Sequence, residues 1–480
     1  MATTTKSKPQ TPFPVALAPA PAPAAKRRKV PRREHAAIGN VDRDPVELLE
    51  INSAGRIEKL VPLRYGRMIQ SPFAFYRGSA IIQAHDLAGT PNSGLPMQIC
   101  GDCHLANFGG FATPERTLIF DVNDFDETSY GPWEWDLKRL TASFVVAARH
   151  LGHKRGAAEA LVRRTVGSYQ TRMADYAQMG VLETWYDRIS FERLLAEATM
   201  SPEARKRVQR GIEKAADRTS AALLPKLSAQ VDGRWIIHDT PPVVFHGSGA
   251  VSLLSKEDRW EFGAAGRTAL HKAFDGYLST LAPDRRHLLG YFTGQDIAYK
   301  VVGVGSVGTR CLIYLLIDRN GKPLFLQIKE AVQSVVARYF KGPHVAHQGQ
   351  RVVDGQRLMQ AASDMFLGWT DGPRKRHFYV RQLRDMKLSA QIELMDAELL
   401  GEYAALCGWV LARAHAKASG DAAGISAYLG TSDRFADAMV AYGDAYADQV
   451  EKDYDLFAAA CRSGRLEARS EEDMAADFRA

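Results

Sequence analysis

Polar residues of the types that handle phosphate groups cluster in the first half of the chain. A short apolar run ends at Gly101-Asp102, and Asn107 follows Asp102 by five residues. A second apolar run, 117–120, is followed at once by four acidic residues. These acids are Asp121, Asp124, Asp126 and Glu127. Two strands that end side by side would bring carboxylates and an amide to one place.

Phosphoryl transfer requires this combination of side chains. One carboxylate must orient or deprotonate an attacking hydroxyl, while a second carboxylate and an amide oxygen hold magnesium on the phosphates. Magnesium prefers oxygen ligands and keeps several waters, so two protein ligands suffice. A single Asp or Asn after a strand is ordinarily a turn or cap residue. Four neighbouring acids repel one another, however, and a cation relieves that repulsion best. We therefore expect a magnesium site among these acids, with Asp121 as one candidate ligand.

The same stretch contains Cys100-Gly-Asp-Cys103-His104, which satisfies the C-x-x-C-H pattern of covalent haem attachment. That chemistry requires export, and no export signal is visible. No second C-x-x-C supplies a partner for zinc. Five cysteines in 480 residues fit a reducing compartment, so we expect a cytoplasmic protein. We interpret the two cysteines as small apolar residues that flank Asp102.

A glycine-rich segment in the second half predicts a nucleotide site. A strand leads into G-x-G-x-x-G, the chain returns as a strand over 311–317, and a third strand ends at Lys329. The glycines are Gly303, Gly305 and Gly308. The motif alone is weak, and a plain hairpin with flexible glycines is the alternative. A dinucleotide fold is disfavoured because no helix follows the glycines. The order strand, glycine loop, strand and Lys-bearing strand is that of the protein-kinase small lobe.

Two basic residues are expected to contact the phosphates, and one acid is expected to hold the lysine in place. Alternation places Gln327 and Lys329 on one face of their strand, where Lys329 would bind the α- and β-phosphates. The next segment scans as a helix and offers Asp354 as the acid that holds this lysine. Arg77 follows an aromatic pair and precedes a glycine, so its guanidinium is a further candidate for the phosphates. The alternative for Arg77 is to brace an acid in the core.

The segment around Asp102 resembles the catalytic and metal loops of aminoglycoside and choline kinases. The resemblance rests on G-D-x-H-x-x-N followed by a hydrophobic strand that ends in D-F-D-E. It implies that Asp102 is the catalytic base, Asn107 a metal ligand and Asp124 the main metal ligand. Asp136, in W-D-L-K, resembles the later aspartate that braces the catalytic loop. The chain departs from the pattern at Cys100, where that family has histidine.

Over a longer span, the chain resembles an uncharacterised bacterial family, domain of unknown function 2252. The matching span runs over roughly residues 45–425. The stretches that carry it are RYGRM, FYRG, GDCHLANFGG, DVNDFDE, WDLKRL, VVGVGSVGTR, LQIKEA and RVVDGQRLMQ. This resemblance implies no established activity.

The two site segments occur in the reverse of the kinase order, because the catalytic segment comes about two hundred residues before the glycines. If both build one site, the fold is α+β: a protein-kinase-like two-lobed fold in circularly permuted order. Its small antiparallel-sheet lobe would come from the C-terminal half, and its large lobe would be mainly helical. We expect a disordered basic tail over 1–40, the catalytic loop and helical lobe over 41–290, the nucleotide-binding small lobe over 291–390, and C-terminal helices on the large lobe over 391–480.

The net charge of +7 comes entirely from the first 36 residues, which hold eight Lys and Arg against Glu34 alone. Residues 37–480 therefore sum to zero, and the body is no basic groove for nucleic acid. The Thr, Pro and Ala residues of the leader predict disorder. No stretch approaches the roughly 18 apolar residues of a membrane-spanning helix. We expect no membrane partner, and a nucleic-acid partner only through the basic tail.

The sequence therefore predicts an ATP- and Mg²⁺-dependent phosphotransferase that acts on an unknown hydroxyl-bearing small molecule or protein. A metal-dependent phosphoesterase is an alternative, because G-D-x-H also supplies metal ligands through Asp102 and His104. It would need further His or Asn ligands downstream, and no G-N-H companion is present. A non-catalytic nucleotide-binding regulatory protein would keep Lys329 and the glycines without turnover.

Overall fold

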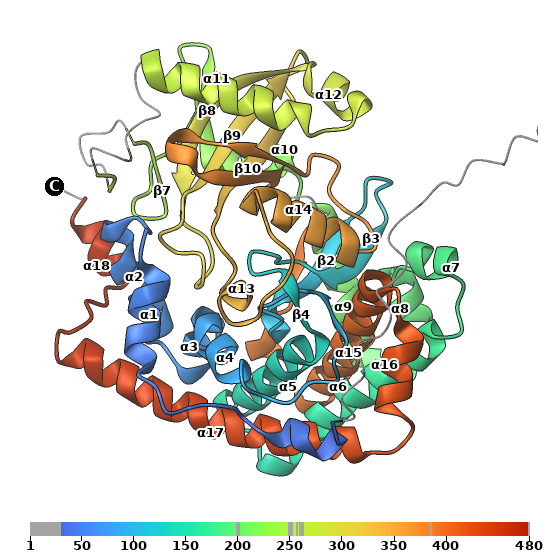
Figure 1. The fold of residues 1–480 in the computed structure, drawn as a ribbon. Helices are drawn as coiled ribbons and strands as arrows, with labels where there is room; N and C mark the ends of the chain where they lie inside the picture. Colours follow the sequence, from blue (N-terminus) through green and yellow to red (C-terminus); the bar gives the residue numbers. More distant parts are fainter. Residues whose placement is uncertain are drawn as a thin grey trace, which may run out of the picture.

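The computed structural model describes residues 30–197, 202–247, 253–255, 258, 264–383 and 386–478. These residues form a mixed structure, with a sheet at one end and a body of helices at the other (Figure 1). The α+β class predicted from the sequence is confirmed.

A six-stranded antiparallel sheet forms the upper part of the molecule (Figure 1), with the strand order β11-β12-β10-β9-β8-β7. The strands are β7 (Val244–Phe245), β8 (Phe292–Lys300), β9 (Cys311–Asp318), β10 (Pro323–Ala331), β11 (Gly368–Asp371) and β12 (His377–Gln382). Along the central strands, successive apolar side chains point to opposite faces of the sheet. Leu324 and Leu326 of β10 therefore pack on one face, and Phe325 packs on the other.

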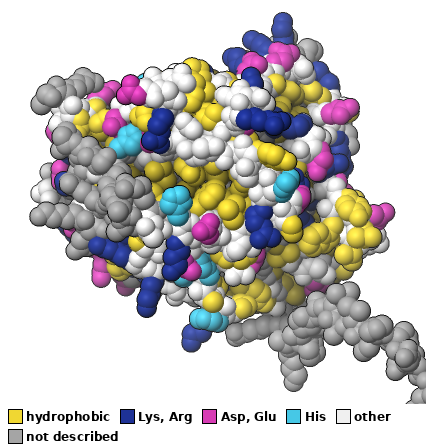
Figure 2. All heavy atoms as spheres, turned by 90° about the horizontal axis from the view of Figure 1, so that it is seen from above, with side chains coloured by type: hydrophobic (Ala, Val, Ile, Leu, Met, Phe, Trp, Pro, Cys, Tyr) yellow, Lys and Arg dark blue, Asp and Glu magenta, His cyan; other side chains and the backbone are white. Residues whose placement is uncertain are grey.

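Helices cover both faces of this sheet. On the outer face, α11 (Ala264–Ser279) and α12 (Pro283–Leu289) pack against leucines of β9 and β10. Hydrophobic side chains reach the surface on this side (Figure 2), around a hollow lined by Phe274 and Tyr314. On the inner face, leucines of α10 (Ser220–Leu227) pack against the same two strands.

The helix α14 (Gln348–Met359) connects β10 to β11 and lies between the sheet and the helical body (Figure 1). It contacts β12 on one side, and on the other it contacts β1 (Pro96–Ile99) and α15 (Ala397–Ser419). The short helix α13 (Val335–Tyr339) packs on α4 (Ala80–Leu87). These contacts join the sheet to the part of the chain that carries the first group of site residues.

The helical body is built on four long helices. They are α5 (Trp133–His150), α6 (Arg155–Tyr176), α15 and α17 (Arg434–Arg462), of which α17 runs along the base (Figure 1). A Cβ atom on Gly408 of α15 would lie 2.2 Å from the carbonyl oxygen of Thr165 in α6, so only glycine permits this approach. The shorter helices are α1 (Pro45–Ser53), α2 (Val61–Met68), α3 (Pro72–Gly78), α7 (Val181–Tyr186), α8 (Phe191–Glu197), α9 (Pro202–Ala216), α16 (Ala422–Leu429) and α18 (Glu471–Ala476).

Three small sheets complete the described structure. The strand β1 pairs with β4 (Ser129–Pro132), and β5 (Ser228–Val231) pairs with β6 (Arg234–Ile237). The third sheet has the order β13-β2-β3. Its strands are β2 (Phe108–Ala112), β3 (Leu118–Val122) and β13 (Leu388–Ser389). Two of these sheets position the loops after β1 and β3, where the acidic site residues lie.

Two predicted boundaries need correction. The basic tail was expected to be disordered over 1–40, and residues 1–29 lie outside the described residues. From residue 30 the chain is packed: His35 is buried against the rings of Tyr428 and Phe435, and the Arg32 Nε donates to the Tyr428 carbonyl oxygen at 2.7 Å. The small lobe was expected to begin at residue 291, but β7 joins its sheet from an earlier segment. No helix among the described residues is both long and apolar enough to cross a membrane.

Candidate active site

The loop after β1 carries Asp102 and is held by a buried carboxylate. Asp136, near the start of α5, accepts hydrogen bonds from the backbone N–H groups of Cys100 at 2.7 Å and Gly101 at 2.9 Å. Its Oδ2 also lies 3.2 Å from the Nε2 of His415 on α15. Gly101 has a φ of 82°, and a Cβ there would lie 2.1 Å from the Glu127 carbonyl oxygen. The turn before Asp102 therefore requires glycine.

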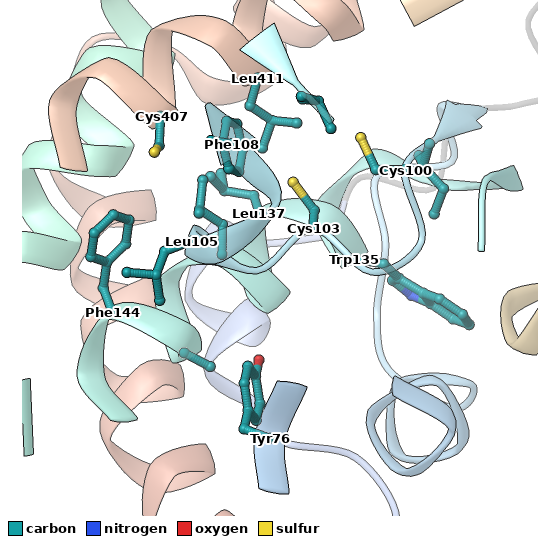
Figure 3. Close-up of a cluster of buried hydrophobic side chains, with 14 of the residues drawn as sticks. Tyr76, Cys100, Cys103, Leu105, Phe108, Trp135, Leu137, Phe144, Cys407 and Leu411 are labelled. Carbon is teal, nitrogen blue, oxygen red and sulfur yellow. The ribbon is translucent and has the colours of Figure 1, made fainter. Parts of the chain in front are cut away.

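Apolar side chains anchor this loop in the core. Cys100, Cys103, Leu105 and Phe108 are buried, and Figure 3 shows them among side chains of α5 and α15. Burial raises the pKa of both thiols, that of Cys103 to about 11. All five cysteines of the chain are free. Cys100 and Cys103 are thus buried thiols that pack among apolar side chains on either side of Asp102.

Asp102 faces the cleft beside an arginine that the sequence did not single out. Its Oδ1 accepts a hydrogen bond from the Arg139 Nε at 2.8 Å, and its side chain remains 21% exposed. Burial raises the pKa of Asp102, and the charge of Asp126 adds to the effect, whereas Arg139 opposes it. The Asn107 amide nitrogen donates to the Asp102 carbonyl oxygen at 2.8 Å, which leaves the amide oxygen as the free acceptor end. Asp102 and Asn107 are therefore held as one unit.

The loop after β3 presents Asp124 and Asp126. The Asp124 Oδ1 accepts the backbone N–H of Asp126 at 3.1 Å. Burial raises the pKa of Asp124, and the charge of Asp126 raises it further. Asp126 forms an ion pair with Lys329 and accepts hydrogen bonds from the Tyr379 hydroxyl at 2.7 Å and the Ser306 hydroxyl at 3.1 Å. Burial alone would raise the pKa of Asp126, but Lys329, Tyr379 and Arg381 together outweigh burial and lower it.

Glu127 adds a further carboxylate to the same loop. Its Oε2 accepts the backbone N–H of Val335, at the start of α13, at 2.7 Å. Burial raises the pKa of Glu127 to about 7, and the charges of Asp126 and Asp102 contribute in the same direction. The charge of Asp126 thus raises the cost of ionising Asp102, Asp124 and Glu127 in this cleft.

Two arginines from the N-terminal segment form hydrogen bonds with the glycine-rich loop between β8 and β9. The Arg56 Nη1 donates to the carbonyl oxygens of Gly305 at 2.8 Å and Val307 at 2.7 Å. Arg67 donates to the carbonyl oxygen of Gly303. Arginines thus occupy these carbonyl groups. Within the loop, the Val307 N–H donates to the Val304 carbonyl oxygen at 3.4 Å, and the Thr309 N–H donates to the Ser306 carbonyl oxygen at 3.2 Å.

These elements line one cleft, with a cavity of about 110 Å³. Residues from both halves of the chain meet there. The predicted site residues in its lining are Arg77, Asp102, Asn107, Asp124, Gly303 and Gly305. Lys329 reaches the same acids through its ion pair with Asp126. Gly308 lies against Arg56 rather than in the lining.

Two predicted site residues lie elsewhere. Asp121 is fully buried and accepts two hydrogen bonds from the Arg413 Nη2, at 2.8 and 3.0 Å, and one from the backbone N–H of Ala361 at 2.8 Å. Its oxygens are therefore committed to the core, and the expectation that it binds metal is wrong. Asp354 is exposed on α14, and Lys329 pairs with Asp126 instead. The expected partner of Lys329 is therefore also corrected.

Sequence reasoning missed the residues that hold the site together. Asp126 was noted only as one of four neighbouring acids, yet it is the partner of Lys329. Arg139 lies one helical turn after Asp136, and this i, i+3 spacing was a signal that both face the same loop. Arg56 and Arg67 are more than 230 residues from the glycines they hold, and no local signal marks them.

The fold and the cleft define a class: a mixed α+β protein in which a glycine-rich loop closes over a cluster of carboxylates. A family model described as an uncharacterised protein conserved in bacteria (DUF2252) matches residues 56–460, so the chain belongs to this family. The resemblance to this uncharacterised family, predicted from the sequence, is thereby confirmed. No curated protein and no solved structure matches the chain.

Proposed function

We propose that this protein is an ATP- and Mg²⁺-dependent phosphotransferase with a circularly permuted, protein-kinase-like arrangement. One observation carries the proposal: Asp102, Asn107 and Asp124 share a single cleft with the glycine-rich loop, although about two hundred residues separate the two groups. Phosphoryl transfer needs little covalent chemistry from a protein, and relies on positioning and on charge stabilisation. The cleft offers both.

Each group in the cleft has a role in this proposal. Asp102 would accept the proton of the attacking hydroxyl, and its exposed side chain next to Arg139 suits that position. The Asp124 carboxylate and the Asn107 amide oxygen would hold Mg²⁺, which suits oxygen ligands. Lys329 would exchange its contact with Asp126 for the phosphates of the nucleotide. Arginines 56 and 67 would keep the glycine-rich loop in place over them.

The order of elements supports the permuted arrangement. From β8 the chain runs through the glycine-rich loop, β9, β10 with Lys329, α14, β11 and β12. A protein-kinase small lobe has the same sequence of strand, glycine loop, strand, Lys-bearing strand and helix. The acidic loops that follow such a lobe in kinases come here from residues before 130.

With the glycine-rich loop closed over it, the cleft has the size of a phosphate site. Its cavity of about 110 Å³ equals the volume of about four water molecules. A whole nucleotide therefore requires the glycine-rich loop to move away from Asp126, to which the Ser306 hydroxyl is bonded at 3.1 Å. Loops that close over a reaction in this way commonly exclude water from it.

A metal-dependent phosphoesterase receives less support from the geometry. The described His, Cys, Asp and Glu side chains form two groups with metal-ligand spacing, and neither contains Asp102 or His104. His104 is buried, with its Nε2 3.9 Å from the Asp102 Oδ2.

The free thiols of all five cysteines favour a reducing compartment, and we place the protein in the cytoplasm.

Two matched variants test this function. Asp102→Asn is expected to retain binding of ATP with Mg²⁺ and to lose ATP turnover, measured as phosphate release with water as acceptor. Asp124→Asn is expected to lose both, since a metal ligand acts on the bound nucleotide itself. Equal and mild effects of the two substitutions would show that both acids are structural and would overturn the proposal.

A further inference from the structure

Arg77 is a largely buried arginine without a protein partner. It lies in the last turn of α3 and lines the cleft. Among the described residues, no hydrogen bond or ion pair engages its guanidinium, and its Nε is sealed from solvent without an acceptor. The ring of Phe73 lies 5.7 Å from the guanidinium carbon. A buried charge without a partner is costly, so such an arginine points to an anion from outside the chain.

His104 is a second unpartnered group in the same cleft. Its side chain is 5% exposed, its Nδ1 has no hydrogen-bond partner among the described residues, and its Nε2 lies 3.9 Å from the Asp102 Oδ2. An imidazole ring carries at least one N–H, which can donate a hydrogen bond to a ligand.

Both groups lie on the Asp102 side of the cleft. The lining of the cavity contains all three of Arg77, Asp102 and His104. Asp102 forms its hydrogen-bonded ion pair with Arg139, and no hydrogen bond or ion pair joins it to Arg77 among the described residues. Glu393, the other acid that acts on Arg77, is exposed. The acceptor hydroxyl must approach Asp102 from this side, since Asp102 is the proposed base.

We propose that Arg77 and His104 bind an anionic group of the acceptor, so that the substrate is an alcohol that carries its own phosphate or carboxylate. This inference rests on the proposed function and names its substrate class. The guanidinium offers a planar fork that matches either anion with two parallel hydrogen bonds. An N–H of the His104 imidazole adds a donor in the same cleft lining.

The reaction follows from this placement. The acceptor hydroxyl oxygen attacks the γ-phosphorus of ATP, and its proton passes to Asp102. The bond between the γ-phosphorus and the bridging oxygen breaks, and ADP leaves with that electron pair. The product carries two anionic groups, the one bound by Arg77 and the newly transferred phosphoryl group. Arg77 thus fixes the distance between the recognised anion and the reacting hydroxyl.

Small anions serve as probes of this site. We expect inorganic phosphate or acetate to raise the melting temperature of the wild-type protein when a non-hydrolysable ATP analogue and Mg²⁺ already saturate the nucleotide side. Stabilisation by phosphate would indicate a substrate that carries a phosphate, and stabilisation by acetate would indicate one that carries a carboxylate. Arg77→Ala should weaken the affinity for the anion that binds by about tenfold to a hundredfold, and His104→Phe should weaken it less. Arg338→Ala, which removes an exposed arginine on α13, is the matched control and should bind like wild type.

The melting temperature without probe separates a ligand-binding arginine from a structural one. Arg77→Ala should melt at or above the wild-type temperature, because it removes an unpaired charge. A lower melting temperature with unchanged anion affinity would overturn the proposal, as would an absent anion effect in the wild type. Loss of ATP–Mg²⁺ stabilisation in Arg77→Ala would assign Arg77 to the nucleotide instead. If wild type binds no nucleotide but binds phosphate through Arg77, the phosphotransferase fails and the anion site stands.

Discussion

The titration of Glu127 gives a quantitative test of the electrostatics of the cleft. Its pKa is raised from the ordinary 4.5 to about 7, mainly by burial and also by the charges of Asp126 and Asp102. The folded protein therefore binds a proton at pH values where the unfolded chain has released it. Stability from this group is fully present below about pH 4.5 and is lost as the pH rises through about 7.

The size of the effect follows from the two pKa values. Between about pH 5 and about pH 8.5, Glu127 should cost the wild-type protein about 2.5 kcal/mol of unfolding free energy. Glu127→Gln does not titrate and can still accept the hydrogen bond from Val335. The assay is urea unfolding of both proteins at the two pH values, without Mg²⁺. Titrating groups that do not interact with Glu127 cancel in the difference between wild type and variant.

The wild type is expected to lose more stability than Glu127→Gln over this pH range, by about 2.5 kcal/mol. Parallel pH dependence of the two proteins would refute the reasoning, because it would mean that Glu127 ionises in the fold as easily as in the unfolded chain. Added Mg²⁺ should narrow the difference at high pH, since a bound cation offsets the repulsion among the carboxylates.

Two further substitutions test groups outside the reacting centre. Asp121→Ala should lower the unfolding free energy by about 3–5 kcal/mol, because it leaves Arg413 buried and unpaired; urea unfolding that shows a change below about 1 kcal/mol would contradict this structural role. Asp136→Asn should lower stability by about 1–3 kcal/mol, because one of the loop amides then loses its acceptor. It should also reduce ATP turnover more than ATP affinity, as measured by phosphate release and calorimetry, and full turnover would show that the loop does not need this carboxylate.

Local patterns predicted the parts of the site that lie within one segment. The strand β9, the glycine-rich turn and the strand β10, which carries Lys329, all follow from alternation and turn residues over about thirty positions. The loop that carries Asp102 and Asn107 likewise lies between a short strand and β2. In each case the backbone geometry depends on neighbouring residues.

Contacts between distant segments could not be predicted in this way. The pairing of Lys329 with Asp126 joins residues 203 positions apart, and the choice of Asp126 over Asp354 depends on the rotation of α14. That helix buries Val352 and Val353 and turns Asp354 to solvent. Asp121 shows the same limit, because its role follows from Arg413 on a helix 292 positions later. Nothing in the residues around Asp121 distinguishes a buried ion pair from a metal ligand.

Thermal stabilisation by ATP, with and without Mg²⁺, tests the phosphotransferase site most directly. At a nucleotide concentration about a hundredfold above its dissociation constant, binding should stabilise the wild type by about 2.7 kcal/mol. The stabilisation should depend on Mg²⁺, vanish in Asp124→Asn and persist in the matched control Asp354→Asn, whose carboxylate is exposed. Absence of stabilisation in the wild type, or equal stabilisation in Asp124→Asn, would contradict a magnesium nucleotide site in this cleft.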